Sequence, residues 1–178
     1  MALHRPQAVE RGARSFTMSN VPITILGIGC TLYADQGFGV GVIQALRERY
    51  HFPEDVHLVD GGLVGVGLTG TIAGAGRLIA VDAIENGGEP GDIYRFEGRR
   101  ILERLSGKNP VQHVEFLEAL AHCQALDDPP QAVLLGIEPS DTQSVACELT
   151  PELRAKVDDM IGCVLNELDR IGVVYRRK

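Results

Sequence analysis

The stretch TILGIGCTLYADQGFGV, residues 24–40, decides how the rest of the chain is arranged. It opens with a short apolar run typical of a buried strand, and Gly27 and Gly29 then allow the backbone to leave that strand in a sharp turn. From Val40 onward, apolar residues recur at helical spacing as far as Tyr50. Residues 35–37 therefore follow the carboxyl end of a strand and precede a helix, at the edge where open α/β sheets bind ligands.

The rest of the chain alternates in the same way. Short apolar runs predict four further strands, at 56–59, 77–82, 93–96 and 132–137, with 93–96 at a sheet edge. Helical spacing predicts three further helices, at 63–75, 111–124 and 151–168, while the polar, irregular stretch 98–110 predicts a loop. This order predicts a three-layer αβα sandwich with a mainly parallel, twisted central sheet of about five strands.

Length and charge narrow the classes of function. The chain has 178 residues; residues 1–20 carry no apolar periodicity and predict a disordered extension, and residues 21–178 predict one α/β domain. With 24 acidic and 17 basic residues the net charge is −7, which argues against a nucleic-acid partner. The longest uncharged run, 61–76, is too rich in glycine to cross a membrane.

The cysteines indicate a reducing compartment. There are four of them, none in a CxxC pair, and the chain shows no secretory signal. Reduced thiols in a cytoplasmic protein are therefore expected. Cys30 stands at the end of the first strand, where a thiolate nucleophile is conceivable, although a single buried cysteine more commonly acts as a small apolar side chain.

A dinucleotide site is disfavoured by glycine spacing. Gly27 and Gly29 follow a strand as the fingerprint G-x-G-x-x-G requires, but Leu32 stands at the third glycine position. The close packing of helix against strand and the seat for a pyrophosphate are then lost. A nucleotide-linked α/β enzyme is thus a remote alternative.

Polar residues at strand ends suggest a metal instead. Asp82 ends a central strand, Gln36 follows the first one and His113 begins a helix, with Asp35 and Asp60 as supporting carboxylates. Parallel topology brings such positions to one edge of the sheet. Carboxylate, amide and imidazole groups together suit a divalent ion such as nickel or zinc.

Several ordered motifs resemble those of the hydrogenase maturation endopeptidases. They are residues 27–40, Val59-Asp60-Gly61-Gly62, residues 78–83, Glu89-Pro90-Gly91 and residues 135–139. The resemblance extends from Val21 to the last helix. It implies a nickel-dependent endopeptidase that removes a C-terminal extension from the large-subunit precursor of a nickel-iron hydrogenase, with nickel shared between enzyme and substrate.

The resemblance also implies a ligand set. The family aspartate corresponds to Asp82, the family glutamate position holds Gln36, and the family histidine corresponds to His113 or to a position near Asn109. Cys30 stands where the family usually has asparagine. A neutral Gln36 removes one negative charge from a dication site. The alternative is therefore a homologue that binds nickel or the large subunit without cutting it.

Overall fold

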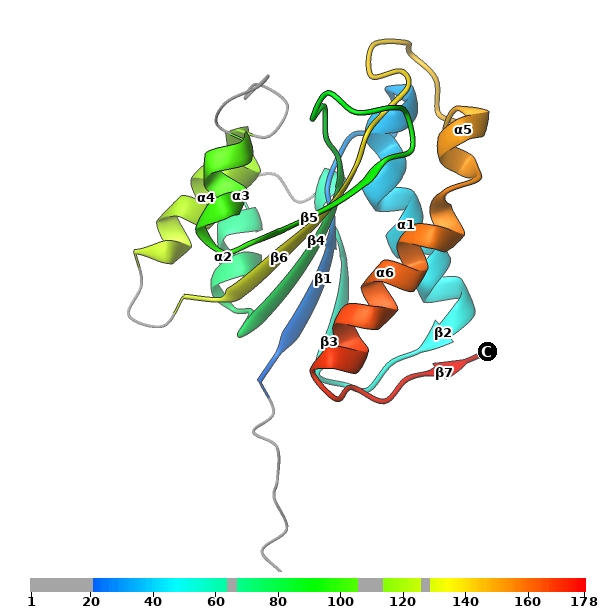
Figure 1. Cartoon of the computed structure of the whole chain (residues 1–178). Coiled ribbons are helices and arrows are strands. Elements are labelled where there is room, and N and C mark those ends of the chain that lie inside the picture. The colour runs from blue at the N-terminus through cyan, green and yellow to red at the C-terminus, as the bar shows by residue number, and fades with distance from the viewer. Residues whose placement is uncertain (1–20, 64–66, 106–113, 126–128) are drawn as a thin grey trace, which may run out of the picture.

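Five strands form the central sheet of the chain, whose computed structural model describes residues 21–63, 67–105, 114–125 and 129–178 (Figure 1). The strand order is β3-β1-β4-β6-β5. The strands are β1 (Ile23–Gly27), β3 (Val56–Asp60), β4 (Arg77–Ala83), β5 (Ile93–Glu97) and β6 (Gln131–Ile137). All neighbours are parallel except β5, which pairs antiparallel with β6 at the edge. The predicted sheet and the edge position of 93–96 are confirmed.

The order of the strands creates one reversal point. From β1 the chain passes through α1 (Phe38–Arg49) to β3 on one side of β1, then through α2 (Leu68–Ala73) to β4 on the other side. The carboxyl ends of β1 and β4 therefore flank the place where strand order reverses. Crevices at such points are the usual ligand sites of open α/β sheets.

Helices cover both faces of the sheet, which confirms the three-layer architecture (Figure 1). On one face, α1 and α6 (Val157–Arg170) enclose a core that includes Phe38, Leu46 and Val164, all fully buried. On the other face, α2, α3 (Arg99–Leu105) and α4 (Val114–Gln124) enclose a second core around Leu78 and Phe116. The alternation of side chains along each central strand supplies apolar groups to both cores.

Glycine shapes the exit from β1. Gly29 has a φ of +123°, and a Cβ there would lie 1.7 Å from the carbonyl oxygen of Gln36. Gly39 packs so tightly on the sheet that a Cβ would lie 2.2 Å from the carbonyl oxygen of Val81. Glycine at these positions lets the short 3-10 helix η1 (Ala34–Gly37) and α1 lie directly on the ends of β1 and β4.

Some predicted elements are wrong in detail. Residues 99–105 of the predicted loop form α3, because Ile101 and Leu105, one helical turn apart, are buried in the core that α2 and α4 also enclose. Its three apolar residues, Ile101, Leu102 and Leu105, span little more than one turn, which is too short for a clear periodic signal, and tertiary packing stabilises this short helix. The last predicted helix is two, α5 (Pro151–Arg154) and α6, since the chain turns at Ala155 and Lys156.

The remaining differences lie at the ends of elements. The glycine-rich helix predicted at 63–75 is shorter, with η2 (Gly61–Leu63) before it. Two strands that lack any sequence signal, β2 (Tyr50–His51) and β7 (Arg176–Arg177), pair antiparallel with each other. Residues 1–20 and 111–113 lie outside the described residues, so the extension and the start predicted for the third helix stay predictions. No helix among the described residues is long and apolar enough to cross a membrane.

Candidate functional site

Three loops meet at the carboxyl edge of the parallel strands (Figure 1). They are residues 28–37 after β1, residues 84–92 after β4 and residues 138–150 after β6. Asp82 lies at this edge, one residue before the end of β4, and only 2% of it is exposed. Val81 and Ala83 pack under α1 and α6, so the alternation of the strand directs Asp82 to the face covered by α2 and α4.

Gln36 lies beside the strand that carries Asp82. Its element, η1, contacts β4 directly, and its amide Nε2 donates a hydrogen bond to the carbonyl oxygen of Thr142 at 2.7 Å. A carbonyl only accepts, so the nitrogen of the amide faces Thr142 and Oε1 lies on the other side of the group. The Thr142 hydroxyl donates to Glu85 Oε1 at 3.1 Å. Thr142 thus ties the loops after β1, β4 and β6 together.

Asp35 belongs to the frame of the site. Its carboxylate is fully buried and accepts four hydrogen bonds, from the backbone N–H groups of Ser140, Asp141 and Thr150 and from the Thr150 hydroxyl. Its own N–H donates to the carbonyl of Asp141. Both oxygens are therefore occupied by donors at the two ends of loop 138–150, and Asp35 holds that loop against the turn after β1.

Glu138 performs a similar task on the loop after β4. It is 7% exposed and accepts hydrogen bonds from the N–H groups of Asn86 and Gly87 and from the hydroxyl of Tyr94. Burial raises the pKa of the Glu138 carboxyl, but the hydrogen bond from Tyr94 and those from the backbone outweigh it and leave the pKa below 4.5. A stable anion therefore fixes the chain that follows Asp82.

The remaining candidate residues from the sequence are Asp60, Cys30, His113 and Asn109. Asp60 ends β3 and its Oδ1 accepts a hydrogen bond from the N–H of Gly62 at 3.0 Å, so it closes the turn there. Cys30 is partly buried and lies in the turn after β1, where its carbonyl accepts from the N–H of Tyr33. His113 and Asn109 lie outside the described residues. Within the described residues, no three His, Cys, Asp or Glu side chains gather closely enough to hold a metal ion.

Sequence reasoning missed the residues that hold the loops. These residues are Thr142, Thr150 and Glu138, of which only Glu138 falls within one of the motifs, residues 135–139. Glu138 carried a usable signal, because it follows a buried strand just as Asp82 ends one. Thr142 carried none, since its role depends on a backbone carbonyl.

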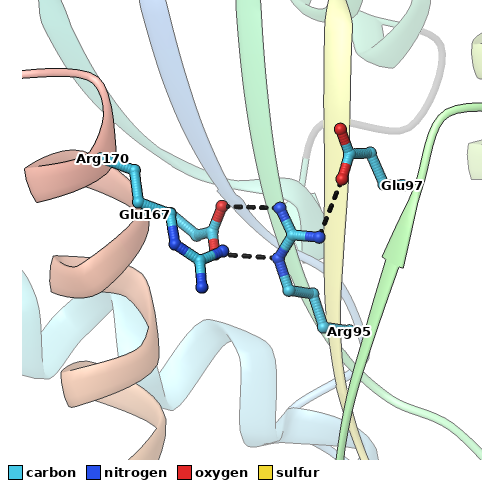
Figure 2. A network of polar contacts seen from close by, with 4 residues as sticks. All are labelled: Arg95, Glu97, Glu167 and Arg170. Carbon is cyan, nitrogen blue, oxygen red and sulfur yellow. Dashed lines mark hydrogen bonds and ion pairs between the residues drawn. The ribbon is translucent and has the colours of Figure 1, made fainter.

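A second polar network joins β5 to α6 on the face of the sheet opposite to the one that Asp82 faces (Figure 2). Arg95 Nε and Nη2 donate to the two carboxylate oxygens of Glu167 at 2.9 and 3.0 Å, its Nη1 donates to Glu97, and Arg170 also donates to Glu167. The bond from Arg95, opposed by burial, lowers the pKa of Glu167. These groups line a cavity of about 490 Å³. Because they pair with one another and join β5 to α6, this network is structural.

Comparisons with known proteins agree on one family. A model of the hydrogenase maturation protease family matches residues 40–167. The hydrogenase expression/formation protein HupD of Thiocapsa roseopersicina is 34% identical over 162 residues, covering 90% of this chain and 73% of the relative. HoxM of Cupriavidus necator is 36% identical over 152 residues, covering 84% and 75%.

The solved structures point the same way. The hydrogenase maturating endopeptidase HybD from E. coli superposes with a TM-score of 0.82 at 27% identity, covering 88% of this chain and 98% of that one. An edge built from the ends of β1 and β4, a matching family model and these relatives lead to a single assignment: the chain belongs to the hydrogenase maturation protease family.

Proposed function

We propose that this protease removes a C-terminal extension from the large-subunit precursor of a nickel-iron hydrogenase, and that it acts on precursor already loaded with nickel. The observation that carries the proposal is the position of Asp82 and Gln36 at the point of strand reversal, in a chain of this family. The reaction is proposed to occur in the cytoplasm, where the four free thiols stay reduced.

Nickel enters this scheme as part of the substrate. Asp82 offers an anionic oxygen at the end of β4, and Gln36 offers Oε1, because Thr142 already binds its Nε2. Both are oxygen donors, and the precursor supplies the other ligands. His113, or alternatively Asn109, is proposed to add a further donor. The pair Asp82 and Gln36 carries one negative charge fewer than an aspartate with a glutamate would, so we expect modest affinity for free nickel.

The chain itself contributes by positioning the scissile bond of the substrate. Loops 28–37, 84–92 and 138–150 are joined by Thr142 and by the buried carboxylates of Asp35 and Glu138, so the edge is rigid before substrate arrives. When this edge binds the nickel-containing part of the precursor, it holds the scissile bond in one geometry. Positioning of this kind lowers a barrier without a nucleophile triad.

The test uses the full chain and a nickel-loaded large-subunit precursor. Mass spectrometry is expected to show loss of the C-terminal extension, and none from the same precursor prepared without nickel. Asp82→Asn is expected to reduce the rate at least a hundredfold. The matched control is Glu97→Gln, which removes a carboxylate on the opposite face of the sheet and is expected to leave the rate unchanged.

Gln36 favours one second candidate, a relative that binds precursor without cutting it. Its neutral amide gives a weaker ligand than a carboxylate. Binding of nickel-loaded precursor by the wild type without release of the extension would support this candidate and contradict the protease proposal. Equal cleavage of precursor with and without nickel would contradict the role given to Asp82 and Gln36.

A further inference from the structure

The loop after β6 carries a short backbone edge beside the candidate site. We infer that this edge, residues Val145 to Cys147, pairs with an extended segment of the polypeptide substrate as an added strand. The inference rests on the proposed function only in taking the substrate to be the large-subunit precursor. That the partner is a polypeptide follows from the protease family of the chain.

The inner side of this edge is already paired. Ala146 forms a parallel bridge with Tyr33. The N–H of Ala146 donates to the carbonyl of Leu32 at 3.1 Å, and its carbonyl accepts from the N–H of Ala34 at 2.7 Å. Asp35 fixes the loop on both sides of this bridge, at Ser140 and Asp141 and again at Thr150.

The outer side is open. Ala146 turns its N–H and C=O toward residues 32–34, and because the peptide bonds on both sides of Ala146 are trans, the carbonyl of Val145 and the N–H of Cys147 point away from Tyr33. In the part of the chain that the structure describes, these groups take no part in any hydrogen bond. A row of unpaired backbone groups on a fixed edge is a template for another strand.

Apolar side chains accompany this edge. Val145 is 81% exposed, Leu32 57% and Tyr33 40%, and these are three of the five large apolar residues exposed among the described residues. They suit a partner that pairs through its backbone and whose own side chains cover these apolar residues. A small polar ligand would leave this apolar surface in water.

The edge is continuous with the candidate site. Thr142, three residues before Val145, holds Gln36, and Tyr33 lies three residues before Gln36 on the other segment. A substrate segment that pairs with residues 145–147 therefore lies next to the carboxyl edge of the sheet, where Gln36 is located. This explains why loop 138–150 is held at so many points: a docking strand must be fixed to define the register of its partner.

Two variants and one exchange measurement test the inference with nickel-loaded precursor. Cys147→Pro removes the outward N–H, while Cys147→Ser keeps it with a similar shape. Cys147→Pro is expected to raise KM about three- to tenfold with kcat unchanged, as for loss of one hydrogen bond, and Cys147→Ser to change KM less than twofold. In wild-type protein, bound precursor is expected to slow amide hydrogen exchange at Cys147 at least tenfold.

The outcomes separate this inference from the proposed function. Cleavage with normal KM in Cys147→Pro, or with no protection of the Cys147 amide, overturns the inference and leaves the function standing. Binding with protection but without cleavage supports the inference and overturns the function. Protection that appears in concentrated protein without precursor shows pairing between copies of this chain and overturns the inference. If Cys147→Pro does not fold, wild-type exchange decides.

Discussion

Asp35 and Thr150 are joined by two hydrogen bonds, although 115 positions separate them in the chain. The N–H of Thr150 donates to Oδ1 at 2.8 Å and its hydroxyl donates to Oδ2 at 3.0 Å. The same hydroxyl accepts from the N–H of Leu153 and caps the first turn of α5. One buried carboxylate thus fixes the turn after β1, the end of loop 138–150 and the start of α5.

Asp35→Asn is expected to lower the free energy of unfolding by about 3 kcal/mol, because an amide presents a donor where the buried carboxylate accepts four hydrogen bonds. Urea denaturation at neutral pH measures it. A double-mutant cycle with Thr150→Val should show coupling of about 1 kcal/mol or more. Additive losses in that cycle would contradict a direct contact.

Gly39→Ala is expected to destabilise the fold by about 2 kcal/mol or more, because the added Cβ meets backbone oxygens of Val81 and Ile28 at 2.2 and 2.5 Å. Gly41→Ala, two residues on in the same helix, is the control. The nearest atom to its Cβ is 3.9 Å away, so alanine there should stabilise the helix by about 0.5 kcal/mol. Thermal unfolding of both variants gives the comparison, and equal melting temperatures would refute the close approach.

The lowered pKa of Glu138 predicts that the stability of the fold depends on pH. Its pKa in the fold lies below the 4.5 expected when unfolded, so its carboxylate stabilises the fold above that value. The contribution is lost as pH falls through 4.5 and then through the lower pKa of the folded state. Glu138→Gln should therefore be less stable than wild type at pH 7, by about 1 kcal/mol or more. Denaturation curves from pH 7 to about pH 3 should show the two converging, and a constant difference would argue against this role.

Gln36→Glu is expected to weaken the attachment of loop 138–150. A carboxylate oxygen would face the carbonyl oxygen of Thr142, now 2.7 Å from the Gln36 nitrogen, and two acceptors repel. At pH 7 this variant should be less stable than Gln36→Ala, which only removes the contact, by about 1 kcal/mol. Calorimetry on the two variants measures the difference. A Glu variant as stable as wild type would show that the loop adapts.

Much of the fold could be predicted because its signals are local. Apolar runs such as 77–82 and the helical spacing after Val40 depend on neighbouring residues, and they placed the strands, the parallel order and the edge that carries Asp82 and Gln36. The helix α3 could not be predicted, since Ile101 and Leu105 are its only buried residues and the core in which they pack is built largely from other elements.

The sequence by itself determined that Asp82, Asp35 and Gln36 come to one edge, because the turn after a strand and the end of a parallel strand are set by local pattern and topology. Only the tertiary structure decided their separate tasks. Asp35 holds the loop after β6 in place, because the groups that donate hydrogen bonds to it stand 105 to 115 positions later in the chain. The side chain of Gln36 is oriented by a backbone carbonyl on the same distant loop. Hydrogen bonds over such separations form only after the sheet has brought β1 and β6 to the same edge.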